Sequence, residues 1–514
     1  MFRGAQAKKR RGTALVLYTV LLPTTLLFCG LAIDLCMLYV VQTRLSSAVD
    51  GAALGAGRLL GTTANTSEIA GEFLNANYPS GYWGSYNLTP SISVTNNSSL
   101  HTVAVSATVQ VPLLFLRLLR QQYCTVAASA TAVRRDVRVE LVLDRSYSMI
   151  DQMSNLRTAA TTFVNMFNPG TDELGLVILS GSSFVAYPTS EMPNYSLTSG
   201  TGPDVHFADS VTGSNQNMLT LISALQLGSD TNTSEAIWLA YMELKKAAAI
   251  DSDPTKANVI VLFTDGVPNG FTSYLNNPSS NALGSNSNCK YDPATSSSST
   301  QMNGWIAAAG TSSTLSFFSP TNSTGIGFFN SLIFDTVHSS YYWVTNVGSG
   351  GYVDDLVEVT GTPMTNCSHI GGYGSLGSGT DMSGLATIPS QDYYGNSTSG
   401  TAYTQGVLYQ QYGIAYNSSQ PTNGYQMGLA SWNVADNAAQ KILSDSNMNV
   451  AIYTIGFTGD GGVDAVLLNR MANTQSSSSY NSSYQTGMYV EASDAASMQQ
   501  AFGQVASEVL RLAH

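Results

Sequence analysis

Three oxygen-bearing side chains stand at alternate positions in the segment Asp144-Arg-Ser146-Tyr-Ser148. The segment follows a largely apolar run, residues 137–143, which predicts a buried strand, and it precedes a stretch with helical periodicity. In a strand-turn-helix unit, the turn lies at the carboxyl edge of a parallel sheet, where open α/β folds bind their ligands. The three side chains therefore form half of a candidate divalent-metal site.

Two other segments supply the remaining oxygen atoms. Thr231 lies just before a helical stretch, residues 234–250, and Asp265 follows a second apolar run, residues 259–263. Two carboxylates and three hydroxyls form an all-oxygen set, which suits a hard cation such as Mg²⁺, with Mn²⁺ or Ca²⁺ as alternatives. The first segment taken alone is also typical of a helix-capping turn, because Asp and Ser accept hydrogen bonds from free N–H groups there.

This pattern resembles the metal-ion-dependent adhesion site of von Willebrand factor A domains, which reads D-x-S-x-S, then a distant Thr, then an Asp that ends a later strand. Carried over position by position, the pattern falls on Asp144, Ser146, Ser148, Thr231 and Asp265. The resemblance implies an α/β fold with a doubly wound parallel sheet, and a protein partner whose carboxylate completes the metal shell. Residues 493–512 carry apolar residues at helical spacing, which predicts a last helix. The resemblance implies that this helix either slides when the metal binds or only covers the sheet.

Residues 13–33 form an apolar run without a charge, long enough to cross a hydrocarbon layer. Five basic residues precede this run, and the first acid, Asp34, follows it. The positive-inside bias predicts a single-pass inner-membrane protein with a cytoplasmic amino terminus and a periplasmic or extracellular main domain. A cleaved signal peptide is the alternative, although the run is long for one and no A-x-A site closes it.

Residues 35–136 predict a small stem of helices and strands. The apolar helix continues past Asp34 with a face of small residues, which predicts close packing against another element. A second helix is expected over residues 67–77. Residues 102–111 alternate strictly between apolar and polar, which predicts a strand paired with residues 125–133.

Short motifs flank the apolar run: Arg10-Arg-Gly12 before it, Pro23 within it, Gly30-Leu-Ala-Ile-Asp34 at its exit and the segment 44–53 beyond it. With these motifs the region resembles the TadE/TadG-like family of Flp (tight adherence) pilus-assembly proteins. An anchor of this kind joined to a von Willebrand factor A domain is similar to the TadG-like branch, which implies other pilus-assembly components as partners. Pilin-like members carry Glu at the fifth position after a processing Gly, whereas here Leu17 occupies that place, so the resemblance does not extend to the processing signal.

The predicted organisation has five parts. They are a basic tail (1–12), a transmembrane helix (13–34), the TadE/TadG-like stem (35–136), a von Willebrand factor A domain in two segments (137–269 and 426–514), and an insertion (270–425). The insertion is rich in Gly, Ser, Asn and Tyr, and its length favours a mostly β structure of its own. It would serve either as a recognition surface or as a solvated spacer. Its Cys289 and Cys367 are candidates for a disulfide outside the cell.

The composition favours an exported binding protein over an enzyme. The chain carries 21 Lys and Arg against 33 Asp and Glu, a net charge of −12, so its overall field repels nucleic acid and anionic lipid. No nucleophile elbow, P-loop or dinucleotide fingerprint occurs. The two leading hypotheses are a metal-dependent adhesion or protein-interaction module and a structural scaffold of the pilus machinery. A hydrolase in the insertion that uses His338 or His369 is the weakest alternative.

Overall fold

The described chain divides into two compact units, residues 1–135 and residues 136–513. The computed structural model describes residues 9–58, 60, 65–97, 100–181, 183–188, 202–209, 217–225, 227, 231–251, 253, 255–276, 301–308, 326–329, 331–335, 340–344, 357–358, 388–400, 424–459 and 462–512.

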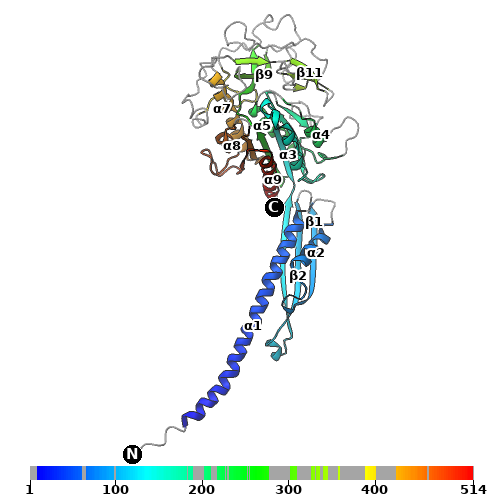
Figure 1. The fold of residues 1–514 in the computed structure, drawn as a ribbon, viewed down its shortest axis with the longest axis vertical. Helices are drawn as coiled ribbons and strands as arrows, with labels where there is room; N and C mark the ends of the chain where they lie inside the picture. The colour runs from blue at the N-terminus through cyan, green and yellow to red at the C-terminus, as the bar shows by residue number, and fades with distance from the viewer. Residues whose placement is uncertain are drawn as a thin grey trace, which may run out of the picture. The chain divides into compact units, whose positions relative to one another are not determined.

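The first unit is a long helix that lies along a three-stranded antiparallel sheet (Figure 1). Its main elements are α1 (Lys9–Gly57), α2 (Thr66–Asn77), β1 (Tyr86–Asn97), β2 (Leu100–Pro112) and β3 (Tyr123–Arg135). Two short 3₁₀ turns, η1 (Tyr82–Gly84) and η2 (Leu116–Leu119), precede β1 and β3. The predicted helix over 67–77 and the predicted pairing of 102–111 with 125–133 are both found, and β1 is an additional strand.

The core of this unit follows directly from two periodicities in the sequence. Alternate residues of β2, among them Val103, Val105 and Val109, are buried on one face of the sheet. A stripe of α1 at helical spacing, including Val41 and Leu45, is buried against them. The sheet therefore has one covered and one open face, as expected for a short antiparallel sheet.

The small residues of α1 do allow close packing. A Cβ atom added to Gly55 would lie 3.0 Å from the ring of Phe73 in α2, and one added to Gly57 would lie 3.0 Å from Ala132 in β3. Contacts this short leave little room for a larger side chain. The predicted small-residue face therefore packs against α2 and β3.

The second unit is built on a six-stranded sheet with the order β15-β14-β7-β4-β5-β6. The strands are β4 (Val137–Asp144), β5 (Glu173–Leu179), β6 (Phe184–Tyr187), β7 (Ala257–Thr264), β14 (Ala451–Phe457) and β15 (Tyr489–Ala492). Neighbouring strands are parallel except at the edge, where β6 runs antiparallel to β5. All eight residues of β4 are buried, because helices cover both faces of the sheet.

Each face of this sheet has its own hydrophobic core and its own helices. The helices are α3 (Met153–Val164), α4 (Met218–Ser223) and α9 (Ala495–Leu512) on one face, and α5 (Thr233–Ile250), α7 (Gly424–Leu443) and α8 (Ala465–Met471) on the other. The predicted fold class, an apolar amino-terminal helix followed by a doubly wound α/β sheet, is confirmed. One local difference is that a 3₁₀ turn, η3 (Tyr147–Asp151), separates the Asp144–Ser148 segment from α3.

The described part of the predicted insertion is largely β structure. Strands β8 (Gly270–Asn276), β9 (Gln301–Ala308) and β10 (Ile326–Phe329) form one antiparallel sheet, and β11 (Ser331–Asp335), β12 (Ser340–Val344) and β13 (Val357–Glu358) form another. Phe271 and Thr272 at the start of β8 are buried. The two cysteines and two histidines singled out in the insertion lie outside the described residues; they are Cys289, Cys367, His338 and His369.

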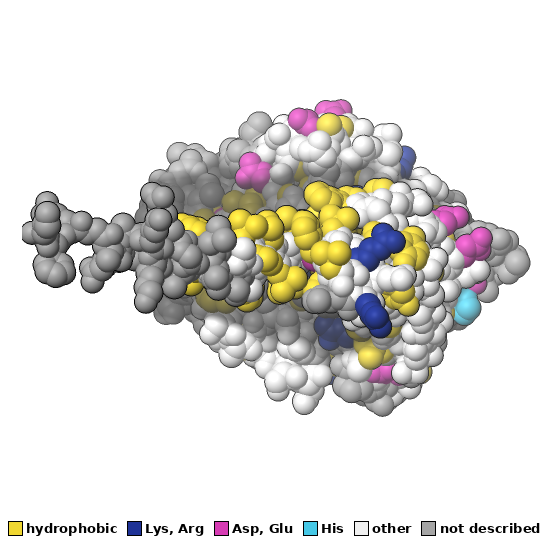
Figure 2. Space-filling model, turned by 90° about the horizontal axis from the view of Figure 1, so that it is seen from below, with side chains coloured by type: hydrophobic (Ala, Val, Ile, Leu, Met, Phe, Trp, Pro, Cys, Tyr) yellow, Lys and Arg dark blue, Asp and Glu magenta, His cyan; other side chains and the backbone are white. Residues whose placement is uncertain are grey.

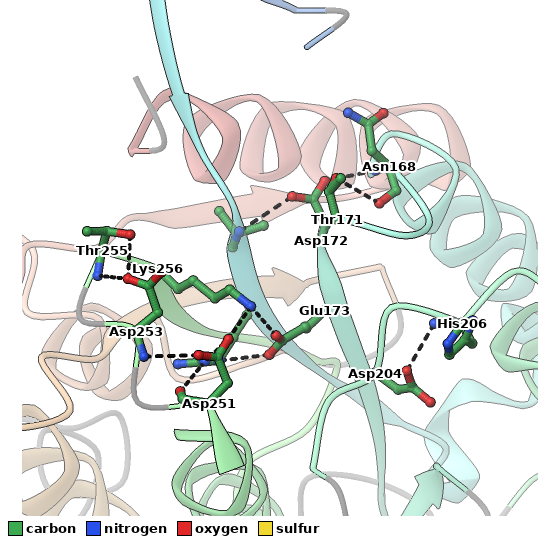
Figure 3. Close-up of polar contacts among 12 residues, drawn as sticks. Asn168, Thr171, Asp172, Glu173, Asp204, His206, Asp251, Asp253, Thr255 and Lys256 are labelled. Carbon is green, nitrogen blue, oxygen red and sulfur yellow. Dashed lines mark hydrogen bonds and ion pairs between the residues drawn. The ribbon is translucent and has the colours of Figure 1, made fainter. Parts of the chain in front are cut away.

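At the amino-terminal ends of the central strands, charged side chains form a connected network (Figure 3). Arg138 is only 1% exposed, and its Nε donates to Glu173 Oε2 over 2.7 Å. Its Nη2 lies 3.2 Å from Asp251 Oδ2. Lys256 bridges the same two acids, at 2.5 Å from Glu173 and 2.6 Å from Asp251. The network ties β4, β5, α5 and β7 together at the end of the sheet away from Asp144 and Asp265.

Replacing Glu173 by Gln should destabilise the second unit, because it leaves the buried guanidinium of Arg138 without its closest anion. We expect the free energy of unfolding to fall by about 3 kcal/mol. Denaturant titration of the detergent-solubilised chain, followed by fluorescence of the buried Trp238 and Trp432, measures this change.

The matched control is Glu508→Gln, whose partner Arg511 is 77% exposed. An exposed pair of this kind contributes within about 0.5 kcal/mol. Equal effects of the two substitutions would show that the buried network does not stabilise the sheet.

Candidate metal centre

The two candidate carboxylates lie at the ends of neighbouring strands. Asp144 is the last residue of β4 and Asp265 follows the last residue of β7, and the ladder pairs Leu143 directly with Phe263. From β4 the strand order continues through β5 on one side and through β7 on the other, so these two strand ends flank the topological switch point of the sheet. Open α/β sheets bind their ligands at this place.

Ser146 and Ser148 bring their hydroxyl groups to the same carboxylate. Ser148 Oγ donates to Asp265 Oδ1 over 2.9 Å, and Ser146 Oγ donates to the same oxygen over 3.2 Å. The two hydroxyl oxygens lie 3.0 Å apart. The turn that connects β4 to η3 therefore places both serines opposite Asp265, although Ser148 and Asp265 are 117 positions apart in the chain.

Asp144 is held by its own turn and by a residue that the sequence interpretation missed. Its Oδ1 accepts a hydrogen bond of 2.8 Å from the Ser146 N–H, the short-range bond of an Asx turn. Its Oδ2 accepts a bond of 2.5 Å from Thr264 Oγ1, at the end of β7. Thr264 thus fixes the Asp144 carboxylate. No pattern in the sequence distinguishes this threonine from an ordinary strand residue.

Thr231 lies beside the pair of strand ends. It is 5% exposed, and its Oγ1 would lie 2.9 Å from a Cβ atom added to Gly266, the residue after Asp265. A glycine at position 266 therefore allows the hydroxyl of Thr231 to approach this edge. Two hydrogen bonds hold the Thr231 backbone, one from its N–H to Asn269 Oδ1 at 3.0 Å and one from the Asn269 N–H to its carbonyl at 3.1 Å. Asp230, whose part in the site the sequence leaves open, lies outside the described residues.

The residue after Thr231 anchors this loop in the core. Asn232 is fully buried and caps α5 by accepting a hydrogen bond from the Glu235 N–H. Its Nδ2 donates to Gly181 O and to Thr272 Oγ1, both at 2.9 Å. Asn at the cap and Glu three residues later are a recognisable capping signal, so sequence analysis could have found this pair. The loop that carries Thr231 is therefore fixed to the segment that follows β5, to α5 and to β8.

Two buried acids, Asp144 and Asp265, dominate the electrostatics of the site. Burial raises the pKa of Asp144 from 3.8 to about 6, although the hydrogen bonds from Thr264 and Ser146 lower it. Burial also raises the pKa of Asp265, and the charge of Asp144 adds to this, to about 8. Two carboxylates this close disfavour each other's ionised form unless a positive charge lies between them.

The residues present fit a hard divalent cation. Asp265 Oδ2 is buried and has no hydrogen-bond partner, and a buried charged oxygen left in this state is costly. In the described part of the chain, no group of three or more His, Cys, Asp or Glu side chains could hold a metal ion, so a cation here would also need the hydroxyl oxygens. Two carboxylates with serine and threonine hydroxyls are ligands that Mg²⁺ accepts.

The raised pKa values predict that the metal-free chain is most stable in mild acid. Between about pH 4 and pH 8 the folded chain binds more protons at Asp144 and Asp265 than the unfolded chain does, so its free energy of unfolding falls as the pH rises. Denaturant titrations at pH 5 and pH 8 in EDTA should show this loss, and added Mg²⁺ should restore stability mainly at pH 8.

Asp265→Asn serves as the control, because it removes one of the two titrating groups of this site and should weaken the dependence on pH. Burial also raises the pKa of Glu140 and Asp392, and their contribution is the same in both chains. Acids whose pKa is lowered by folding, such as Asp251, are already ionised in both states above about pH 5 and do not mask the effect. A metal-free chain whose stability is constant or rises from pH 5 to pH 8 would contradict the predicted repulsion.

Comparison with protein families gives two adjoining matches in the first unit. Residues 12–59 match the family model of Flp pilus-assembly TadE/G-like proteins, and residues 46–132 match that of Tad-like Flp pilus-assembly proteins. No curated protein matches the chain in sequence.

Solved structures with some similarity include proteins of pili. The PilB minor pilin from Streptococcus sanguinis is 12% identical and covers 84% of this chain and 80% of its own, with a TM-score of 0.33. The vWF domain of the type V pili tip protein Mfa5 from Porphyromonas gingivalis is 14% identical and covers 74% of this chain and 98% of its own, at 0.31. A von Willebrand factor type A protein from Catenulispora acidiphila is 9% identical, with coverage of 82% and 50%, at 0.30. Because these TM-scores are low, the fold class is assigned from the strand order of the six-stranded sheet. Residues 12–132 are therefore similar to Tad-type Flp pilus-assembly proteins, and in this chain they are followed by a doubly wound α/β unit.

Proposed function

We propose that this chain is a membrane-anchored, exported binding protein whose second unit holds a divalent cation and, through it, a carboxylate of a protein partner, in Flp-type pilus assembly or surface attachment. The observation that carries the proposal is the convergence of Asp144, Ser146, Ser148 and Asp265 at the switch point, with one buried carboxylate oxygen left unpaired. The family matches of residues 12–132 support the pilus context.

Each residue would have a distinct part in such a site. Ser146, Ser148 and Thr231 would offer neutral oxygens, while Asp144 and Asp265 would supply the negative charge that retains the ion. A bound cation supplies a positive charge at the sheet edge, where an acidic side chain of a partner could reach it. Mg²⁺ is the first candidate, and Mn²⁺ or Ca²⁺ would meet the same donor set. No catalytic step is part of this proposal.

A scaffold without metal-dependent binding is the second candidate, because the family models match only the first unit and leave the site unmatched. The two candidates differ in what chelation does. In a pull-down from detergent-solubilised cells, EDTA should release the partner of a metal-dependent module. The same treatment should leave a scaffold's partners in place.

The metal itself is tested by calorimetric titration of Mg²⁺ and Mn²⁺ into the purified full chain. Asp144→Ala should lower the affinity at least roughly tenfold, since loss of an outer-shell partner alone has effects of that order. The fold should persist, because the β4 ladder and both cores stay intact.

Asp209→Asn is the charge-matched control, since Asp209 is an exposed acid that pairs with His206 away from the sheet edge. Its metal affinity should equal that of the unchanged chain. Retained affinity in Asp144→Ala, with the same stoichiometry, would remove Asp144 from the site and refute the assignment.

The anchor is proposed from α1. By length and composition, the stretch Leu17–Gly57 is apolar enough to cross a membrane, and at 1.5 Å per residue about 20 residues suffice for the hydrocarbon core. The remaining turns of α1 support the stem sheet. With the basic residues before the apolar run, the amino terminus would lie in the cytoplasm and both units outside the inner membrane.

Protease added to intact spheroplasts should therefore degrade the chain beyond Asp34 and leave a small membrane-bound fragment. A cytoplasmic marker protein serves as the control for leakage. Full protection of the second unit in intact spheroplasts, followed by degradation after lysis, would reverse the proposed orientation.

A further inference from the structure

The connection between β2 and β3 is an exposed apolar tip. Residues 113–120 read Leu-Leu-Phe-Leu-Arg-Leu-Leu-Arg, and the backbone closes through the bond from the Leu113 N–H to Gln122 O. Leu114 is 61% exposed and Leu118 is 78% exposed. Loop tips of water-soluble proteins usually carry small or polar residues, so large aliphatic side chains held out into solvent need an explanation.

The tip is fixed to α1 by a buried carboxylate. Asp34, fully buried, accepts hydrogen bonds from three consecutive backbone N–H groups: Leu114 at 2.9 Å, Phe115 at 3.0 Å and Leu116 at 2.8 Å. Charge-assisted bonds of this kind are among the stronger ones, and three of them hold the turn rigidly. Asp34 is also the residue that ends the charge-free apolar run of the sequence.

A glycine one helical turn earlier completes the docking. A Cβ atom added to Gly30 would lie 2.4 Å from the ring of Phe115, so only glycine admits this ring against the helix. Gly30 and Asp34 are buried, whereas their neighbours Phe28, Ile33 and Leu35 are exposed. The ring therefore lies beside the part of α1 that the proposed anchor places within the membrane.

The charges of the tip are opposite to those of the chain as a whole. The net charge is −12, yet both charged residues of the tip, Arg117 and Arg120, are basic and exposed. Figure 2, seen from below, shows hydrophobic side chains gathered together, with Lys and Arg side chains next to them. Aliphatic side chains beside arginines suit the boundary between acyl chains and anionic headgroups.

We propose that residues 113–120 insert into the outer leaflet of the membrane beside α1, with Leu114, Phe115 and Leu118 among the acyl chains and Arg117 and Arg120 at anionic phospholipid headgroups. The tip would then fix the stem at a defined height above the bilayer, through a second contact besides the helix. This inference rests on the proposed anchor, because Asp34 and Gly30 set the depth of the tip.

The test uses the full chain, purified and reconstituted into vesicles that contain no other protein. Leu118→Trp places a fluorescent probe on the tip. Thr95→Trp is the matched control. Thr95 in β1 is exposed and pairs with Thr102 near the start of β2, whereas the tip follows the end of β2, so the two sites are roughly 30 Å or more apart at 3.4 Å per residue. Quenching by lipid brominated near the headgroup end of the acyl chain is measured for each variant, after subtraction of the signal of the unsubstituted chain.

We expect Leu118→Trp to be quenched several-fold more strongly than Thr95→Trp in phosphatidylcholine vesicles. Quenching should increase when phosphatidylglycerol is added, and the double substitution Arg117→Gln with Arg120→Gln should abolish this increase. Asp34→Asn, which replaces one accepting oxygen by an N–H donor, should reduce the quenching of Leu118→Trp.

Two outcomes would overturn the proposal, and flotation of the vesicles separates them. A chain that floats with the vesicles but is quenched equally at both positions has its tip in water, as a surface for a protein partner would be, and this refutes insertion while leaving the anchor intact. A chain that does not float refutes the anchor and the insertion with it.

Discussion

Repulsion between two buried carboxylates at neighbouring strand ends is the constraint on which the candidate site of the second unit depends. The parallel pairing of β4 and β7 brings Asp144 and Asp265 to one edge, and burial then raises the pKa of both. Hydrogen bonds from Ser146, Ser148 and Thr264 relieve part of the cost but leave Asp265 Oδ2 without a partner. A divalent cation would offset that cost and couple the sheet edge to an external acidic group.

The first unit also contains a buried carboxylate, which is stabilised without a cation. Asp34 is as buried as Asp144, but three backbone N–H groups of the β2–β3 tip satisfy its carboxylate. The buried acids of the two units therefore have different roles. Asp34 fixes one part of the stem to another, whereas Asp265 keeps an unpaired oxygen and is suited to an added ligand.

Sequence periodicity predicted the parts of this fold in which one pattern dominates. The apolar runs gave β4 and β7, strict alternation gave β2, and helical spacing gave α2 and α9. The short edge strand β6 depends on its pairing with β5, which a local pattern does not carry. The sequence pattern named the five candidate ligands. It could not name Thr264, because only the pairing of β4 with β7 brings this residue to Asp144. The insertion has no dominant period, so only its general β character was predictable.

The central claim is that one divalent cation binds at the switch point between β4 and β7. Anomalous diffraction from crystals of the chain grown with Mn²⁺ tests it directly. The account predicts a single strong peak in the second unit, within direct coordination distance, about 2.0–2.3 Å, of the hydroxyl oxygens of Ser146 and Ser148 and facing Asp265. A fully occupied Mn²⁺ peak elsewhere in the unit, with none at this edge, would contradict it.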